Sequence, residues 1–129
     1  MFESLDFVYL PSRDVAGDLK HLTEAMGADL VFAIEAFGTR VAMVSLAEHS
    51  PALLLAGHLE GDQPVLVYRV GDLGQTIVEL ARRGGEVAAR FEIPHGPVAE
   101  LVTPGPQRIA VYELTRPEAP ARLAGRRDF

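Results

Sequence analysis

A weak internal repeat constrains the fold of this chain more than any other feature of its sequence. With a shift of 58 residues, a candidate helix cap, an apolar residue and a glycine of the first half fall on identical residues of the second half. These pairs are Asp14 with Asp72, Leu22 with Leu80 and Gly27 with Gly85. Two copies of so long a unit are too few to stack as a solenoid. The repeat therefore predicts a duplicated module that closes on itself.

Each copy is predicted to begin with a strand and a helix. Leu5–Leu10 and Val65–Val70 are rich in β-branched and aromatic residues, which favour strands. Asp14 and Asp72 follow these segments, and an aspartate carboxylate can accept hydrogen bonds from the first amides of a helix. Apolar residues then recur at helical spacing until a glycine ends each helix.

Three further strands are predicted after each helix, separated by turns rich in glycine and proline. The expected strands are Leu30–Phe37, Arg40–Leu46, Ala52–Gly57, Glu86–Ile93, Val98–Val102 and Arg108–Thr115. The predicted fold class is α+β, with two tandem βαβββ modules. Residues 1–129 are expected to form one domain, with module one at about 4–59, module two at about 63–115 and an irregular tail at 116–129.

The composition excludes several classes of chemistry and partner. The chain has no cysteine, which excludes disulfides, thiolate catalysis and zinc sites built on thiolates. Its net charge of −6 makes it a poor generic binder of nucleic acid, so the arginine-rich final residues are interpreted as a solvated tail. No apolar run is long enough to cross a bilayer, and the acidic amino terminus is unlike a secretory signal. A cytoplasmic protein without a membrane or nucleic-acid partner is predicted.

Three segments of the second half carry a resemblance to a known family. They are Pro64–Leu73, Arg90–Pro97 and Arg108–Leu114, within the duplicated βαβββ order. This pattern resembles the vicinal oxygen chelate superfamily, which includes glyoxalase I, bleomycin-resistance proteins and extradiol dioxygenases, and looks like its small bacterial glyoxalase-like members. The resemblance implies a mixed sheet curled into a cup, with helices on its outer face, and two chains paired as a homodimer. Function does not follow from it directly, because one fold hosts many chemistries.

The resemblance also indicates where metal-using members of the superfamily hold a divalent ion. Their His, Glu or Gln ligands come from the first and last strands of each module, and the matching positions here are Phe7, Ala56, Val65 and Glu113. Three of these side chains have no donor atom, and a single carboxylate does not hold a catalytic metal. No metal or other cofactor is therefore expected, with a divalent ion held by His58 and Glu113 as the alternative. The ligand triad of an extradiol dioxygenase is not found at these positions.

Glu113 is the first candidate for chemistry. Strand alternation places it on one face with Ile109 and Val111, and the resemblance points that face into the cup. A carboxylate in an apolar cavity has a raised pKa and can act as a general base or acid. The alternative, weighed equally, is a structural carboxylate paired with Arg69, which is expected on the cup face together with Val67.

His58 and the pair Glu92 and His95 are the other candidates. His58 lies two residues after Ala56, so strand alternation would keep it on the cup side, but a linker histidine that faces water is favoured. Glu92 and His95 have the Glu-x-x-His spacing of carboxylate-bridged metal sites, yet Pro94 excludes the helix that this geometry needs. The pair is expected at the rim of the cup, either hydrogen-bonding a ligand or, the favoured alternative, stabilising a turn.

The predicted lining of the cup is largely apolar and aromatic. The residues expected to contact a ligand are Phe7, Tyr9, Ala56, Val65, Val67, Arg69, Phe91, Glu92 and His95. Such a lining is typical of a pocket for a small hydrophobic or aromatic molecule, although the sequence does not separate a pocket from a filled core. The favoured function is a metal-independent binder of the resistance or sequestration type. The alternative is a lyase or isomerase that uses Glu113 as general base, assisted by His58 or His95, and a vestigial structural module is a third hypothesis.

Overall fold

Both halves of the chain fold as strand, helix and three further strands, which confirms the predicted α+β class. The computed structural model describes residues 1–129. Module one consists of β1 (Ser4–Pro11), α1 (Val15–Lys20) with a π-helical turn at His21–Ala25, β2 (Asp29–Ala36), β3 (Thr39–Ser45) and β4 (Ala52–Ala56). Module two consists of β5 (Val65–Val70), α2 (Leu73–Arg82), β6 (Val87–Ile93), β7 (Gly96–Leu101) and β8 (Arg108–Glu113). No helix is long and apolar enough to cross a membrane.

The two predicted aspartate caps begin the two main helices. The Asp14 carboxylate accepts a hydrogen bond from the Gly17 amide at 3.0 Å, and Asp72 accepts one from the Gln75 amide at 2.9 Å. Each bond satisfies an amide that has no partner inside its helix, which is why the chain turns from strand to helix at these residues.

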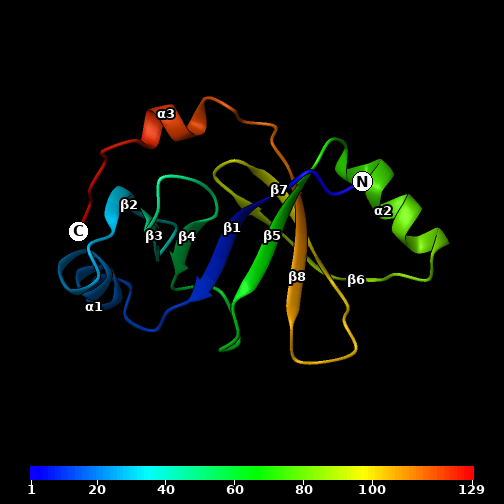
Figure 1. Ribbon diagram of the computed structural model, residues 1–129, viewed down its shortest axis with the longest axis horizontal. Coiled ribbons are helices and arrows are strands. Elements are labelled where there is room, and N and C mark those ends of the chain that lie inside the picture. Colours follow the sequence, from blue (N-terminus) through cyan, green and yellow to red (C-terminus); the bar gives the residue numbers. More distant parts are fainter.

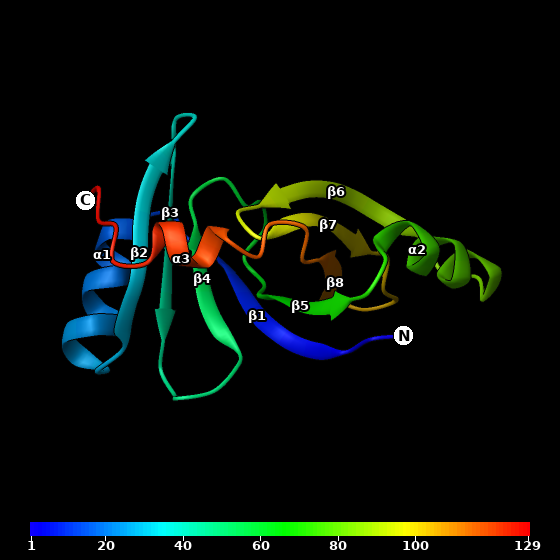
Figure 2. The ribbon, with the colours of Figure 1, turned by 90° about the horizontal axis from the view of Figure 1, so that it is seen from above.

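All eight strands belong to one mixed sheet in the order β2-β3-β4-β1-β5-β8-β7-β6. Within each module the first and last strands are parallel, β1 to β4 and β5 to β8, and the antiparallel pair β1 and β5 joins the modules. The sheet curls, so that β2 and β3 stand as one wall and β6 and β7 as the other (Figure 1, Figure 2). The concave side between these walls is the cup that the sequence predicts.

The helices cover the outer side of the sheet. Val15 and Leu19 of α1 pack on the outer side chains of module one, and Leu73 of α2 packs on Val70 and Val111 of module two. The apolar stripe of each helix therefore faces its own module.

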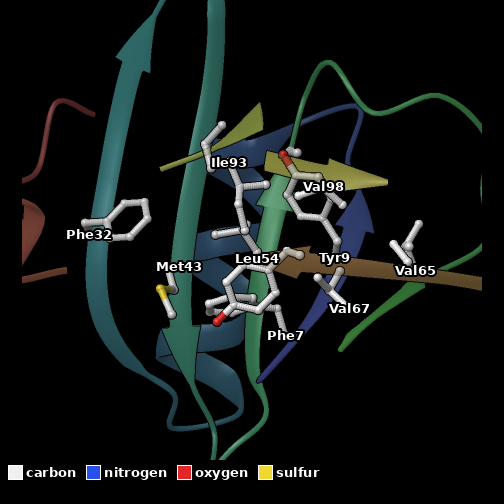
Figure 3. Packing of buried hydrophobic residues seen from close by; sticks show 13 residues of the cluster. Phe7, Tyr9, Phe32, Met43, Leu54, Val65, Val67, Ile93 and Val98 are labelled. Atoms are coloured by element: carbon white, nitrogen blue, oxygen red, sulfur yellow. The ribbon is translucent and has the colours of Figure 1, made fainter. Parts of the chain in front are cut away.

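The concave side of the sheet is packed with side chains. Its cluster contains thirteen buried residues, among them Phe7, Tyr9, Phe32, Leu54 and Val65, drawn from both modules (Figure 3). The centre of the cup is thus a filled core, and open cavities remain only around it.

The carboxyl-terminal residues contain a short helix and pair with module one, so the tail predicted at 116–129 is not wholly irregular, although most of its residues are exposed as expected. After β8 the chain forms α3 (Ala119–Leu123) and crosses the mouth of the cup to reach the free edge of β2 (Figure 2). There the Ala33 amide donates to the Arg126 carbonyl at 2.8 Å, and the Asp128 amide donates to the Ala33 carbonyl at 2.7 Å. An edge strand has unpaired backbone groups, and these final residues satisfy some of them in a parallel arrangement.

Candidate functional site

The largest cavity lies at one end of the cup, between the β2–β3 hairpin, the segment after β4 and the end of β6. Its volume is about 670 Å³, which is in the range of small-molecule pockets. The apolar part of its wall consists of Ile34, Ala36, Phe37, Val41, Ile93 and Pro94, and its polar side chains are Thr39, His58 and Glu92. We call this space the His58 cavity.

His58 is held in the wall of this cavity by two hydrogen-bonding contacts. Its Nε2 atom lies 3.2 Å from the Tyr9 hydroxyl, and its Nδ1 atom lies 3.4 Å from the Thr39 hydroxyl. Burial lowers the pKa of His58 and raises that of Tyr9, so at neutral pH the imidazole is neutral and the phenol keeps its proton. A phenol that keeps its proton can donate to Nε2, and the hydrogen of the neutral imidazole then resides on Nδ1. His58 is exposed and lies in the segment between β4 and β5, as the favoured interpretation of a linker histidine that faces water expects, and its ring also contacts Tyr9 and Thr39.

Glu113 does not face the cup, so the expectation that it shares the cup face with Ile109 and Val111 is wrong. Val111 packs on the outer side against Leu73, whereas Ala110 and Tyr112 belong to the concave core. The Glu113 carboxylate accepts a hydrogen bond from the Leu73 amide at 2.8 Å and so caps the start of α2. A general base for a ligand in the cup cannot be this residue, because its side chain lies on the other side of the sheet.

The sequence prediction matched the last strands of the two modules with an error of one residue, which paired Ala56 with Glu113. Phe7 of β1 is opposite Ala52 of β4, and Val65 of β5 is opposite Arg108 of β8. The counterpart of Ala56 is therefore Tyr112. A shift of one residue in a strand moves every side chain to the other face.

Arg69 pairs with Asp6, so the expected pairing of Arg69 with Glu113 is also wrong. The Arg69 Nε atom donates to the Asp6 carboxylate at 2.9 Å, Ser4 donates at 2.6 Å, and the Tyr112 hydroxyl donates as well. Burial alone would raise the pKa of Asp6, but the hydrogen bonds from these three residues lower it below its ordinary value. Asp6 is thus a buried anion with three donors.

Asp6 is a residue that sequence reasoning missed. Strict alternation would place it on the face opposite to Phe7, yet the pairing of β1 with β5 is irregular between Leu5 and Phe7. This irregularity turns both Asp6 and Phe7 toward the interior. The one signal in the sequence is an acidic residue inside an otherwise apolar strand, and it does not reveal the irregularity.

Glu92 and His95 lie at a strand end and the following turn, and they face different cavities. Glu92 lines the His58 cavity and forms an ion pair with Arg116. His95 is 4% exposed, its ring lies 4.6 Å from that of Phe7, and it lines a second cavity. The Arg116 guanidinium also donates to the carbonyl of Pro94, so it holds the turn between the two residues. Glu92 and His95 therefore do not act on one ligand atom together.

The other residues expected to contact a ligand occupy the packed core. Phe7, Ala56, Val65 and Val67 are all buried in the concave cluster and none lines the His58 cavity. Phe91 packs against this cluster and stacks on Tyr9, with ring centroids 5.9 Å apart and planes inclined by 13°. These residues form the floor of the cup, and Tyr9 reaches the cavity only through its hydroxyl contact with His58.

The positions at which the sequence resemblance places metal ligands do not suit a divalent ion here. The concave cluster residues of the first and last strands are Phe7, Tyr9, Leu54, Ala56, Val65, Val67, Ala110 and Tyr112, and none is a histidine or a carboxylate, the side chains that hold such ions in proteins. Asp6 is the one carboxylate of these strands that turns to the interior, and it is already paired with Arg69. No group of three or more His, Asp or Glu side chains with a suitable arrangement occurs in residues 1–129.

Comparison of the sequence with family models and with curated proteins gave no match. Solved structures do match. Methylmalonyl-CoA epimerase from Mycobacterium tuberculosis is 17% identical with a TM-score of 0.71, covering 87% of this chain and 88% of that chain. A hypothetical protein from Bacillus halodurans is 14% identical with a TM-score of 0.70, covering 85% and 93%.

A mutant of glyoxalase I from Zea mays is also similar, at 14% identity and a TM-score of 0.63. The match covers 89% of this chain and 44% of that longer chain. At such identities the likeness concerns the arrangement of the backbone. Together with the duplicated βαβββ modules and the curled eight-stranded sheet, these matches show that the chain has the glyoxalase-like fold of the vicinal oxygen chelate superfamily.

Proposed function

We propose that this protein binds a small, largely apolar molecule in the His58 cavity. The observation that carries the proposal is a cavity of about 670 Å³ with a mostly apolar wall and one neutral, oriented imidazole in it. Pockets for small molecules commonly combine apolar walls with a few polar groups that fix the orientation of the ligand.

The hydrogen-bonding state of His58 indicates what the ligand carries. Tyr9 occupies the Nε2 atom, while the contact from Nδ1 to Thr39 is long at 3.4 Å. A long contact is a weak hydrogen bond, so the Nδ1 hydrogen is available to a better acceptor. The ligand that fits is therefore an apolar body with one oxygen or nitrogen acceptor.

Phe37 gives independent support for a ligand at this place. It lies at the tip of the β2–β3 hairpin, its side chain is fully exposed, and its φ angle is +52°. Gly38 also has a positive φ angle, of +75°, and a two-residue hairpin turn of type I′ requires positive φ at both residues, so the turn fixes where this exposed ring stands. Phe37 borders the cavity, and it would cover an apolar ligand.

A thermal-shift screen of small apolar compounds with a single acceptor, followed by calorimetry on those that raise the melting temperature, tests the proposal. His58→Ala should weaken binding about tenfold, because one hydrogen bond and part of the wall are lost. His49→Ala is the matched control, since His49 is an exposed loop histidine outside the cavity. Unchanged affinity in His58→Ala, or no shift across the screen, would refute the proposal.

The biological use that fits a binder without a suitable metal site is sequestration of the bound molecule, as in a resistance protein. Expression in a susceptible bacterium should then raise the tolerated concentration of a compound that binds in vitro, and His58→Ala should abolish the protection. We further propose that the chain forms a homodimer and acts in the cytoplasm. Light scattering on the purified protein and cell fractionation check these two points.

A second candidate is an isomerase or lyase in which His58 removes a proton from the ligand. The observation that favours it is the Tyr9–His58 pair beside an apolar cavity, since a neutral imidazole can act as a general base. In this role the imidazole adopts its other tautomer, in which Nε2–H donates to the Tyr9 hydroxyl and the Nδ1 lone pair accepts the ligand proton. In heavy water, wild-type protein should exchange a carbon-bound hydrogen of a bound ligand for deuterium, and His58→Ala should not. Absence of exchange in the wild-type protein would leave only the binding function.

A further inference from the structure

A second, smaller cavity lies near the amino-terminal end of β1, whereas the His58 cavity lies near its carboxyl-terminal end. The second cavity has a volume of about 260 Å³ and is bordered by Asp6, Phe7, Arg69, His95 and Tyr112. We call it the Asp6 cavity. The two cavities have no lining residue in common, so an occupant of the Asp6 cavity is independent of the function proposed above.

The negative charge in the Asp6 cavity is already matched. The Asp6 carboxylate accepts hydrogen bonds from Ser4, Arg69 and Tyr112, and the Arg69 guanidinium supplies the counter-charge at 2.9 Å. A carboxylate with three donors has little capacity left to accept from a ligand. The free hydrogen-bonding capacity of this cavity therefore lies in its donors.

His95 is one of these donors. Its ring is buried against Phe7, and its Nδ1 atom is sealed from solvent without any hydrogen-bond partner. A buried N–H without a partner is rarer in proteins than an acceptor without a partner. The imidazole hydrogen therefore resides on Nε2, and Nδ1 is the bare lone pair. Nε2 also has no partner within the protein, so its hydrogen is available to a ligand at the cavity that His95 lines.

Arg69 is the second donor. Only its Nε atom is bonded to Asp6, its side chain is 39% exposed, and it borders the same cavity as His95. Besides Asp6, the guanidinium interacts with the Tyr112 hydroxyl, and a guanidinium has five N–H donors, so donors remain for a ligand. Phe7 and Leu114 add apolar wall to the same cavity. A ligand oxygen can thus meet the Arg69 guanidinium and the His95 Nε2 hydrogen while its apolar part contacts Phe7.

We infer that the Asp6 cavity is a second binding site, and that it takes the carbonyl oxygen of a small uncharged molecule. The carbonyl supplies the acceptor that His95 and Arg69 lack. A carboxylate supplies acceptors too, but it would place a second negative charge beside Asp6, whose charge already uses that of Arg69. Buried charges without a counter-charge are disfavoured.

The test compares benzamide and benzoate, which have nearly the same shape and differ in charge. Binding is followed by NMR titration of the full chain, with the imidazole nitrogens of His95 observed directly. Benzamide should shift the His95 Nε2 resonance, and benzoate should bind at least tenfold more weakly. The free protein should show the Nε2–H tautomer of His95.

Two variants make the test specific. His95→Phe keeps the ring against Phe7 but removes Nε2, and it should weaken benzamide binding at least fivefold. His21→Ala, which changes an exposed histidine that lines neither cavity, should leave benzamide binding unchanged. Benzoate binding as well as benzamide, an Nδ1–H tautomer in the free protein, or equal affinity in His95→Phe would each overturn the inference, as would no binding of benzamide at millimolar concentration.

Discussion

Two buried polar residues of this protein differ in whether their side-chain atoms have hydrogen-bond partners. Asp6 has three donors for its carboxylate, whereas His95 has a sealed Nδ1 atom without a partner. Both residues are less than a tenth exposed and border the same cavity. A satisfied buried group stabilises the fold and an unsatisfied one costs stability, so these two neighbours are expected to respond to substitution in opposite ways.

Replacing Asp6 by Asn should destabilise the protein by about 2 kcal/mol, because Arg69 and Tyr112 lose a charged acceptor. Urea unfolding at pH 7 measures the change. The matched control is Glu35→Gln, which breaks an exposed ion pair with Arg40 at 3.5 Å and should cost less than about 0.5 kcal/mol. Equal effects of the two substitutions would show that Asp6 is not the satisfied anion described here.

His95 should make the protein less stable in mild acid. Burial, as the main cause, lowers the pKa of His95 to about 4 from its ordinary value of 6.5. Between these two values the unfolded chain binds a proton that the folded chain does not, so stability falls as the pH falls from about 6.5 to about 4, by up to about 3 kcal/mol.

His95→Phe isolates this contribution, because all carboxylates are common to both proteins. Urea unfolding at pH 7 and pH 4.5 should show a smaller loss of stability for His95→Phe than for the wild type. At pH 7 the variant should be at least as stable as the wild type, since it removes a buried atom without a partner. Parallel losses in the two proteins would contradict the lowered pKa.

At the scale of elements, a strand of one module supplies the cap of the helix in the same module. Glu113 at the end of β8 accepts the Leu73 amide, next to the Asp72 cap of α2. The start of α2 thus has two carboxylates. They accept hydrogen bonds from its first amides, and their negative charges interact favourably with the positive end of the helix dipole. Glu113 is best understood as part of the architecture.

Glu113→Ala should therefore lower stability by about 1 kcal/mol and leave ligand binding in the His58 cavity unchanged. The melting temperature and the calorimetric affinity measure the two effects. Glu118→Ala serves as control, because that exposed glutamate makes only a 3.8 Å contact with Arg122. A loss of ligand affinity without a loss of stability would show that Glu113 takes part in ligand binding.

How far the sequence predicted these elements depended on how local their causes are. The caps at Asp14 and Asp72 and the first strand of each module were predicted, because their signals lie within a few adjacent residues. The face of Glu113 was missed, because strand register depends on pairing with a distant strand. The irregularity that turns Asp6 inward depends on such pairing as well.

At the scale of the whole molecule, the two edges of the sheet are treated differently. The β2 edge is covered by the final residues, which donate and accept backbone hydrogen bonds with Ala33, while β6 forms the other edge. Composition suggested a solvated tail because four arginines lie there, but Arg126 is paired with Asp128 and Leu123 packs on the concave core. The contact partners of a tail cannot be identified from its composition.

Removing residues 125–129 should expose the β2 edge. The amides of Ala33 and Glu35 lose their acceptors, so their hydrogen exchange should accelerate well beyond that of amides in the centre of β1. Arg127→Ala is the matched control, because that exposed side chain bonds only to the carbonyl of Phe129. Unchanged exchange at Ala33 in the truncated protein would contradict the pairing.

The pairing of the last residues with β2 has a consequence for the order in which the protein is completed during synthesis. Module one leaves the ribosome first, but the partner of its edge strand is made only after all of module two. A nascent chain therefore displays an unprotected β2 edge while module two is being made, when association with other chains is damaging. Translation must reach Arg126 before this edge is closed, and slow codons in module two would prolong the exposure.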